Sequence, residues 1–390
     1  MRVLGKRTMR ADHTFSKSLT KQPTAIDLFA GAGGMTEGLR KAGFRSLLAN
    51  EYDAMAAQTF SYNHPSVPVI IKDIKELSVD EVLDKAKIKV GELSLISGGP
   101  PCQGFSLAGS RLDKDPRNQM FKEFVRLVEG LEPEVFLFEN VAGILSMSKG
   151  EILKVIVSEF TSIGYKCQYR LVNAADYGVP QARPRFILFG VREGDNFGFP
   201  ELTHSNVEKN MDFFSAELKP YVTVWDALSD LPVIQQGEGE EELSHCGNYA
   251  NEFQRERRGV RKPGAIYNHR ATKHSENIVR RYAAIPEGGD NSQVPEELRT
   301  KKINVFKLDG RKPARTVTCN HRTDLLHPKV PRGTTVREAA RLQSFDDDYQ
   351  FFGNLTRKAK YVTQDDQVGN AVPPLLAKAL GDHMRKMKKW

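Results

Sequence analysis

The stretch AIDLFAGAGG, residues 25–34, decides the fold of this chain. Its apolar part, Ala25 to Phe29, has the length of a buried strand, and a glycine-rich turn follows directly. The next residues, Met35 to Ala42, have the pattern of a helix that ends at Gly43. A strand, a tight turn and a helix in this order form the first unit of a parallel α/β sheet.

The same alternation continues along the first half of the chain. Further strands are expected at residues 45–49, 67–71, 93–97, 135–138, 166–172 and 185–191, and helices at residues 52–63, 121–130 and 152–163. We therefore predict an α/β fold with a doubly wound, mostly parallel sheet. The alternation is lost after about Glu193, which indicates a smaller, loop-rich part of mixed structure, before helices return at residues 335–342 and 374–386.

The composition indicates an intracellular globular protein. Of the 390 residues 39% are hydrophobic and 27% charged, no apolar run is long enough to cross a bilayer, and the basic N-terminus has no signal-peptide core. The four cysteines form no C-x-x-C pair, which argues against a disulfide framework and a zinc site. The nine histidines show no metal-ligand pattern, so we expect no bound metal.

Much of the positive charge lies in one segment. Nine lysines and arginines and only two acidic residues stand between Gln254 and Arg281. Such a cluster is typical of phosphate binding, although a solvated basic surface has the same composition. We regard Arg255, Arg258 and Arg261 as candidate nucleic-acid contacts.

The glycine-rich turn is a candidate cofactor site, because backbone amides at a helix N-terminus can face a polar ligand. Glu51 lies 20 residues after Gly31, at the end of the second strand, where an acid can accept both hydroxyls of a ribose. Asp73 follows the third strand and could accept from an adenine amino group. Thr36 replaces the third glycine of a dinucleotide motif, so the pattern favours a different adenosine-bearing cofactor. A plain turn-building role is the alternative.

A cysteine lies in an unusual place, within the stretch SGGPPCQGFS at residues 97–106. Structural cysteines usually pack among apolar side chains, whereas Cys102 stands on a proline- and glycine-rich loop just after an expected strand. Ligands bind at the carboxyl ends of strands in open α/β sheets. The position therefore favours a functional thiol over a packing one.

Three charged residues are expected in the same cleft as Cys102. Glu139 is expected on the loop beyond the apolar strand at residues 135–138, where desolvation raises the pKa of a carboxyl group and suits it to donate a proton. An N-cap or surface role is the alternative for this acid. Arg183 and Arg185, two positions apart on an extended segment, point to one side and could grip a carboxylate, a phosphate or a base oxygen.

These motifs resemble those of the DNA cytosine-5 methyltransferases that use S-adenosylmethionine. The resemblance is carried, in the family's order, by DLFAGAGG, NEYD, KDI, GPPCQGFS, RNQMF, FENVAG, QARPRFILFGV, TVREAARLQSF and QVGNAVPP. It implies a Rossmann-like methyltransferase fold with a target-recognition domain inserted before the C-terminal helix. The sequence departs from the family's pattern at Asp346, where a proline is usual, and at Asn118, where a glycine is usual.

The resemblance also implies a mechanism. The Cys102 thiolate would attack carbon 6 of a cytosine, which turns carbon 5 into a nucleophile that takes the methyl group. Glu139 would contact nitrogen 3 and the exocyclic amine and hold or donate a proton. Arg183 and Arg185 would orient Glu139 and bind the base oxygen or a flanking phosphate.

The family's cofactor contacts carry over to eleven positions of this chain. They are Phe29, Gly31, Gly33, Glu51, Tyr52, Asp73, Ile74, Pro101, Asn370, Ala371 and Val372. The expected cofactor is S-adenosylmethionine, which leaves as S-adenosylhomocysteine. Because the last three positions lie near the C-terminus, we expect the final helix to return beside the first strand.

The expected partner is double-stranded DNA, whose target base must be rotated out of the duplex. The 104–116 loop is expected to close over that base, and Gln103 and Ser106 are expected to contact the DNA. We expect a flexible basic arm at residues 1–20, a catalytic domain at 21–232, a target-recognition domain at 233–350 and a returning segment at 351–390.

Two other functions share part of this pattern. A tRNA cytosine-5 methyltransferase has similar catalytic motifs, but its C-F-T signature is not found here. A non-catalytic DNA-binding homologue is expected to lack the thiol or the acid, and both are present. We expect a monomeric, cytoplasmic enzyme of a bacterial restriction-modification system, associated with the nucleoid through its DNA.

Overall fold

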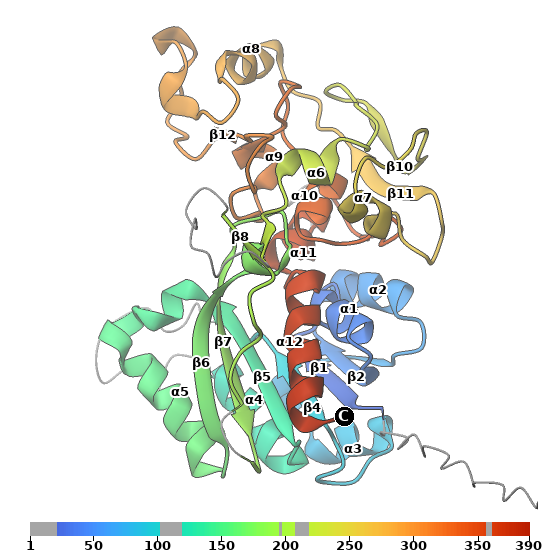
Figure 1. Ribbon diagram of the computed structural model, residues 1–390, viewed down its shortest axis with the longest axis vertical. Coiled ribbons are helices and arrows are strands. Elements are labelled where there is room, and N and C mark those ends of the chain that lie inside the picture. The colour runs from blue at the N-terminus through green and yellow to red at the C-terminus, as the bar shows by residue number, and fades with distance from the viewer. Residues whose placement is uncertain (1–21, 102–118, 195–196, 207–217, 356–360) are drawn as a thin grey trace, which may run out of the picture.

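The computed structural model in Figure 1 describes residues 22–101, 119–194, 197–206, 218–355 and 361–390. The predictions for Cys102, Gln103 and Ser106, for the 104–116 loop and for the basic arm lie outside the described residues. The sheet and its helices form the lower part in Figure 1, and the loop-rich part lies above them.

A seven-stranded sheet forms the centre of the lower part. Its strands, in spatial order, are β3 (Val69–Ile71), β2 (Arg45–Glu51), β1 (Thr24–Leu28), β4 (Leu95–Gly98), β5 (Val135–Val141), β7 (Pro184–Val191) and β6 (Lys166–Asn173). The first five run parallel, and β7 runs antiparallel to both of its neighbours. The predicted mostly parallel sheet is confirmed, and β4 and β5 lie side by side in it.

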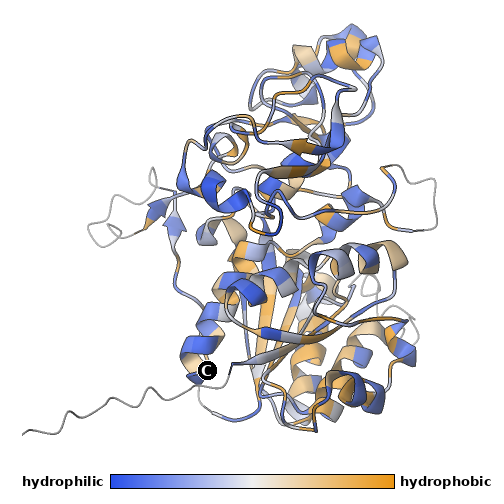
Figure 2. Cartoon of the chain, turned by 90° about the vertical axis from the view of Figure 1, so that its right-hand side faces the viewer, coloured by the Kyte–Doolittle hydropathy of each residue, from blue (hydrophilic) through white to orange (hydrophobic). Residues whose placement is uncertain are grey.

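Helices cover both faces of the sheet. One face carries α3 (Val79–Ala86), α4 (Gln119–Leu131) and α5 (Glu151–Ser162), whose apolar side chains share a core with the strands. The other carries α1 (Gly34–Lys41) and α12 (Pro374–Lys388), which pack on each other, while α2 (Ala54–Asn63) lies beside β2 and β3. Figure 2 shows hydrophobic residues concentrated on the strands between these layers. The C-terminal helix therefore returns to the sheet, as expected.

The upper part is mixed and rich in loops. Its elements are α6 (Val224–Leu228), β10 (Gly239–Ser244), α7 (Glu252–Arg257), β11 (Ala265–Arg270), α8 (Glu276–Ala284), β12 (Phe306–Lys307), α9 (His321–Asp324), β13 (Leu325–Leu326) and α10 (Val336–Leu342). The short strands β8 (His204–Ser205) and β9 (Lys219–Pro220) precede it, and α11 (Gln364–Asn370) follows it. The predicted insertion before the C-terminal helix is confirmed, while the limits of the predicted domains remain predictions.

Two details differ from the sequence analysis. The fifth strand does not end at Phe138 but continues to Val141, so Glu139 lies within β5, opposite Ile187 of β7. A charged residue continues the strand here because an antiparallel neighbour supplies its backbone partners and Arg185 lies beside it. The sequence analysis also did not predict the helices α3 and α11 or the short helices of the loop-rich part, α6, α7, α8 and α9. The described part of the chain contains no helix with the length and apolar character that a membrane span requires.

Candidate active site

One cavity of about 640 Å³ lies where β1, β2, β4 and β5 end. It brings together the glycine-rich turn, the segment after β3, the Gly98–Pro101 loop and the chain between α11 and α12. The following ten predicted cofactor residues line it: Phe29, Gly31, Glu51, Tyr52, Asp73, Ile74, Pro101, Asn370, Ala371 and Val372. Glu139, Arg183 and Arg185 line the same cavity, so the candidate cofactor site and the candidate catalytic site are continuous.

Glu51 is fixed by backbone donors at the edge of this cavity. The Gly31 amide donates to its Oε2 at 2.8 Å, and the Asp53 amide donates to its Oε1 at 2.9 Å. Burial raises the pKa of Glu51, and these two amide donors oppose that rise. A Cβ added at Gly31 would meet no atom within 4 Å, so the turn is open beside the carboxylate. The arrangement leaves lone pairs of Glu51 available to accept from ligand hydroxyls.

Gly33, the eleventh predicted cofactor residue, is not among the residues that line the cavity. It has φ of 92° at the N-cap of α1, and a Cβ there would lie 2.8 Å from Tyr349 Oη and 2.9 Å from His64 Nε2. A glycine is therefore required at this position by its left-handed backbone and by close packing. A glycine is required at position 34 for a different reason, because a Cβ there would lie 2.3 Å from the carbonyl oxygen of Val372. Val372 belongs to the segment between α11 and α12 that lines the cavity.

Among the described residues that line the cavity, acidic groups outnumber basic groups. The acids are Asp27, Glu51, Asp53, Asp73, Glu139 and Asp366, and the bases are Lys72, Arg183 and Arg185. The sequence analysis missed Asp27, which accepts hydrogen bonds from Thr36 Oγ1 at 2.7 Å and Ser97 Oγ at 2.8 Å. Burial raises the pKa of Asp27 to about 6 in spite of these donors. A surplus of carboxylates favours a ligand that carries positive charge.

Glu139 and Arg185 form a buried ion pair in the cavity wall. Arg185 Nε lies 2.9 Å from Glu139 Oε1, and a Cβ on Gly99 would lie 2.9 Å from the other carboxylate oxygen. Burial raises the pKa of Glu139, and the charges of Arg185 and Arg183 oppose the rise. A larger residue at position 99 would therefore crowd the carboxylate.

The Gly98–Pro101 loop is tied to β5 next to this ion pair. Asn140 Nδ2 donates to the carbonyl oxygen of Pro100 at 2.9 Å. Pro101, the next residue, lines the cavity, and Cys102 follows it outside the described residues. Asn140 is a site residue that the sequence analysis missed, although it stands beside Glu139 in the FENVAG motif.

Arg183 has a different environment from Arg185. It is buried and donates to the carbonyl oxygens of Val317 at 2.8 Å, Gly369 at 2.7 Å and Ala371 at 3.0 Å. Two of these bonds hold the end of α11 and Ala371, a predicted cofactor residue, against β7. The two arginines share the cavity, as expected, but only Arg185 forms an ion pair with Glu139.

The three candidate DNA-contacting arginines also differ. Arg255 lies on α7 with its side chain 55% exposed and pairs with Glu252 of the same helix. Arg258 pairs with Asp230 and donates to the carbonyl oxygen of Gly247. Arg261 pairs with Glu37 and Asp348. Each of the three arginines thus has an acidic partner within the protein, and what distinguishes Arg255 is that both members of its pair are exposed.

Comparison with known proteins gives one consistent result. The family model for C-5 cytosine-specific DNA methylase matches residues 24–386. The Type II methyltransferase M.DdeI of Desulfomicrobium norvegicum is 40% identical over 92% of this chain and 88% of its own. M1.HphI of Haemophilus parahaemolyticus, also a Type II methyltransferase, is 36% identical over 93% of this chain and 87% of its own.

A solved structure agrees with these relatives. A putative DNA modification methyltransferase encoded within an E. coli prophage superposes with a TM-score of 0.73 at 28% identity, over 94% of this chain and 100% of that one. The family match covers the strands, the turn and the cavity residues described above. The chain therefore belongs to the C-5 cytosine-specific DNA methylases and is a DNA (cytosine-5)-methyltransferase.

Proposed function

We propose that this protein transfers a methyl group from S-adenosylmethionine to carbon 5 of a cytosine that has been flipped out of a specific double-stranded DNA sequence. The observation that carries the proposal is the continuous cavity, which has Glu51 and the glycine-rich turn at one side and the Glu139–Arg185 pair beside Pro101 at the other. A cofactor and a base could therefore meet in one cavity.

The described residues fit the cofactor. Glu51 offers carboxylate oxygens for the ribose hydroxyls, and the open turn at Gly31 lets the backbone approach the ligand. Tyr52 is 72% exposed at the rim and offers an aromatic face to an adenine. The carboxylate surplus suits the positive charge of the cofactor, which when bound supplies a methyl group on a sulfonium.

Each residue around the base has a separate role in the reaction. The Cys102 thiolate forms a bond to carbon 6, and the ring electrons move toward carbon 5 and nitrogen 3. Glu139 holds a proton at nitrogen 3 and accepts from the exocyclic amine, while Arg185 orients its carboxyl group. Carbon 5 takes the methyl group, its proton then leaves to a base, and the carbon–sulfur bond to Cys102 breaks. In this scheme Arg183 positions Ala371 and the cavity wall.

We infer that the loop-rich part, residues 233–350 in the predicted division, reads the DNA, with Gln103, Ser106 and Arg255 as contacts. We infer that the enzyme acts as a monomer in the bacterial cytoplasm, bound to the nucleoid, and that it protects DNA from a partner restriction nuclease. The Type II methyltransferase relatives support this last inference.

The protein is expected to methylate duplex DNA and not tRNA. The test incubates purified protein with labelled S-adenosylmethionine and either unmethylated plasmid DNA or bulk tRNA, and then sequences the modified cytosines in the DNA. Label at carbon 5 of cytosine within one recurrent duplex sequence is the expected result. Label transferred to tRNA alone would replace this function by the tRNA alternative.

The Glu51→Gln variant is expected to bind the cofactor roughly tenfold to a hundredfold more weakly. The glutamine side chain is uncharged, and only one of its two terminal atoms can accept hydrogen bonds, whereas both carboxylate oxygens of Glu51 do so. KM for S-adenosylmethionine and calorimetric binding of S-adenosylhomocysteine would measure this. Glu151→Gln, at an exposed Glu151–Lys154 pair, is the control and should bind normally. Normal affinity in the Glu51 variant would contradict the proposed ribose contact.

A further inference from the structure

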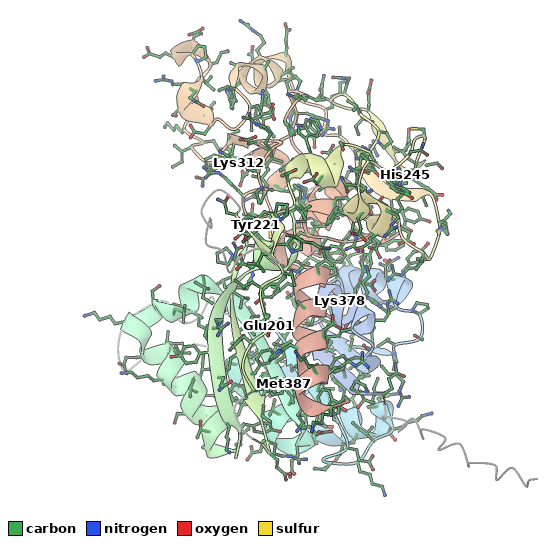
Figure 3. All side chains as sticks on the ribbon, in the orientation of Figure 1. Glu201, Tyr221, His245, Lys312, Lys378 and Met387 are labelled. Carbon is green, nitrogen blue, oxygen red and sulfur yellow. The ribbon has the colours of Figure 1, made fainter. Side chains whose placement is uncertain are left out.

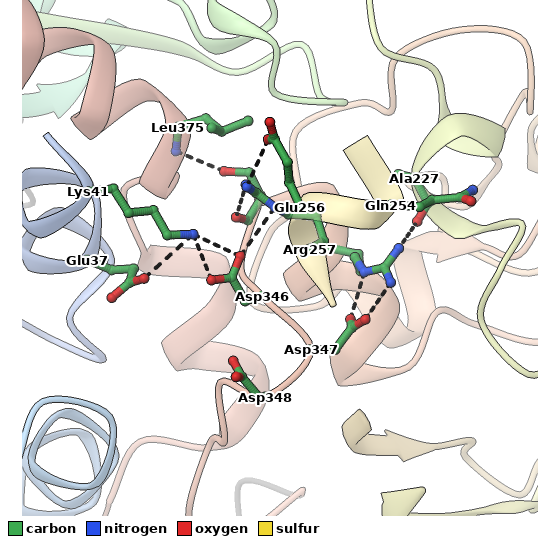
Figure 4. Close-up of polar contacts among 12 residues, drawn as sticks. Glu37, Lys41, Ala227, Gln254, Glu256, Arg257, Asp346, Asp347, Asp348 and Leu375 are labelled. Carbon is green, nitrogen blue, oxygen red and sulfur yellow. Dashed lines mark hydrogen bonds and ion pairs between the residues drawn. The ribbon is translucent and has the colours of Figure 1, made fainter. Parts of the chain in front are cut away.

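Four charged side chains form a closed ring between α1 and the loop-rich part. We call Glu37, Lys41, Asp346 and Arg261 the charge ring. Lys41 Nζ lies 2.7 Å from Asp346 and 3.6 Å from Glu37, and Arg261 closes the ring by contacting Glu37 and by lying 3.9 Å from Asp346. Figure 4 shows Lys41 and Glu37 extending from α1 toward Asp346. Each charge therefore lies between two of opposite sign.

The charge ring is largely shielded from water. The side chains of Glu37 and Asp346 are 0% and 4% exposed, and those of Lys41 and Arg261 are 16% and 23% exposed. Ion pairs in such surroundings are screened little by salt and are strongly affected by the loss of one partner. Burial alone would raise the pKa of Glu37, but the hydrogen bond from Arg40 and the charges of Arg261 and Lys41 lower it to about 2. Glu37 therefore stays ionised at neutral pH.

The charge ring connects the sheet part with the loop-rich part. Glu37 and Lys41 belong to α1, which packs on α12 in the sheet part. Asp346 stands on the turn after α10, at the position where the family pattern has a proline. On its far side Asp346 lies 3.2 Å from Arg257 Nε at the end of α7 (Figure 4). The carboxylate thus lies between the sheet part and α7.

The same turn is joined to the segment from α7 to β11 by backbone bonds. The Asp347 amide donates to the carbonyl oxygen of Arg257 at 2.7 Å, and the Tyr267 amide donates to that of Asp347 at 3.0 Å. Asp348 accepts from the amides of Arg261 and Lys262. The turn and the α7–β11 segment therefore behave as one unit, which carries the exposed Arg255.

We propose that Lys41 and Asp346 are positioning residues for DNA binding, which hold the α7–β11 segment at a fixed orientation to the cavity through the charge ring. The inference rests on the proposed function. One duplex must contact the loop-rich part and also deliver a base to the cavity. If the α7–β11 segment already has a fixed orientation, DNA binding does not have to spend free energy on ordering it. On this view Arg261 stabilises the charge ring and does not contact DNA bases.

The test is a double-mutant cycle with Lys41→Met and Asp346→Asn, which remove charge with little change of shape. Each single variant is expected to raise KM for unmethylated plasmid DNA about tenfold. The double variant is expected to raise this KM by no more than either single variant does, because both substitutions break the same ring. Because the ordering cost falls on binding, kcat should change less than about threefold. KM for S-adenosylmethionine should stay unchanged, since Lys41 stands at the opposite end of α1 from the cavity residue Gly34.

Two controls separate positioning from general loss of stability. Lys41→Arg keeps the charge and should restore normal KM for DNA. Lys378→Met removes the lysine of the exposed Lys378–Asp382 pair on α12 and should leave KM for DNA unchanged (Figure 3). Melting temperatures would show which variants are fully folded at the assay temperature.

The inference is overturned if both single variants keep KM for DNA within about twofold of the wild type, or if their effects multiply in the double variant. A ring with a purely structural role would lower the melting temperature and the amount of active enzyme without changing KM. Wild-type protein that methylates no DNA would instead refute the proposed function, so the two failures are distinguishable.

Discussion

The Cys102→Ala variant is expected to lose methyl transfer to duplex DNA by a factor of at least about 10⁴, because carbon 5 of cytosine is not nucleophilic until a thiolate has added to carbon 6. The position of the residues that precede Cys102 in the chain supports this expectation. Pro101 lines the cavity, and the side chain of Asn140, which follows Glu139 on β5, holds the preceding Pro100 in the same cavity wall. Transfer of labelled methyl groups to plasmid DNA would measure the loss.

The matched control is Cys246→Ala, which removes an exposed thiol and should retain full activity. The Cys102 variant should still bind S-adenosylhomocysteine and DNA. A second measurement tests the bond itself, using DNA with fluorine at carbon 5 of the target cytosine. Because fluorine cannot leave as a proton does, wild-type protein should remain covalently attached to this DNA, and the Cys102 variant should not. Substantial transfer by the variant, or attachment without the thiol, would rule out Cys102 as the nucleophile.

The sequence predicted the sheet and most of the cavity for a simple physical reason. Parallel strands end at one edge of a sheet, so residues at or just after the ends of successive strands, such as Glu51, Asp73 and Pro101, can be expected to come together without detailed knowledge of packing. Gly33 shows where this reasoning stops. A glycine-rich turn has two sides, and its pattern does not tell which glycine faces a ligand and which faces Tyr349 and His64.

The partners of the arginines could not be predicted. Arg183 bonds to a carbonyl 186 positions away, and Arg261 contacts an acid 224 positions away. A local excess of positive charge is the same whether its cations are free for phosphate or neutralised by distant carboxylates. The run of acids at Asp346, Asp347 and Asp348 was the available signal, since three adjacent carboxylates in a buried turn need cationic partners.

The Glu139→Gln variant is expected to lower kcat by roughly 10² to 10⁴ while KM for DNA changes little, because the amide keeps the shape and hydrogen-bonding capacity of the carboxyl group but cannot exchange a proton with nitrogen 3. The buried pair with Arg185 holds this side chain in place for that exchange. Rapid-quench measurement of a single turnover would isolate the chemical step from product release.

The pH dependence gives an independent test of the same role. Burial raises the pKa of Glu139, so its proton is kept to a higher pH than in an ordinary carboxyl group and is lost as the pH rises through that value. A rate that needs protonated Glu139 and an ionised thiol should rise with pH as the thiol ionises and then level off. It should fall at the alkaline end, where the thiol is already fully ionised and further increase of pH only removes the proton of Glu139. The Gln variant has no such proton to lose, so its rate should rise and then stay level. An alkaline fall that persists in the Gln variant would assign the required proton to another group.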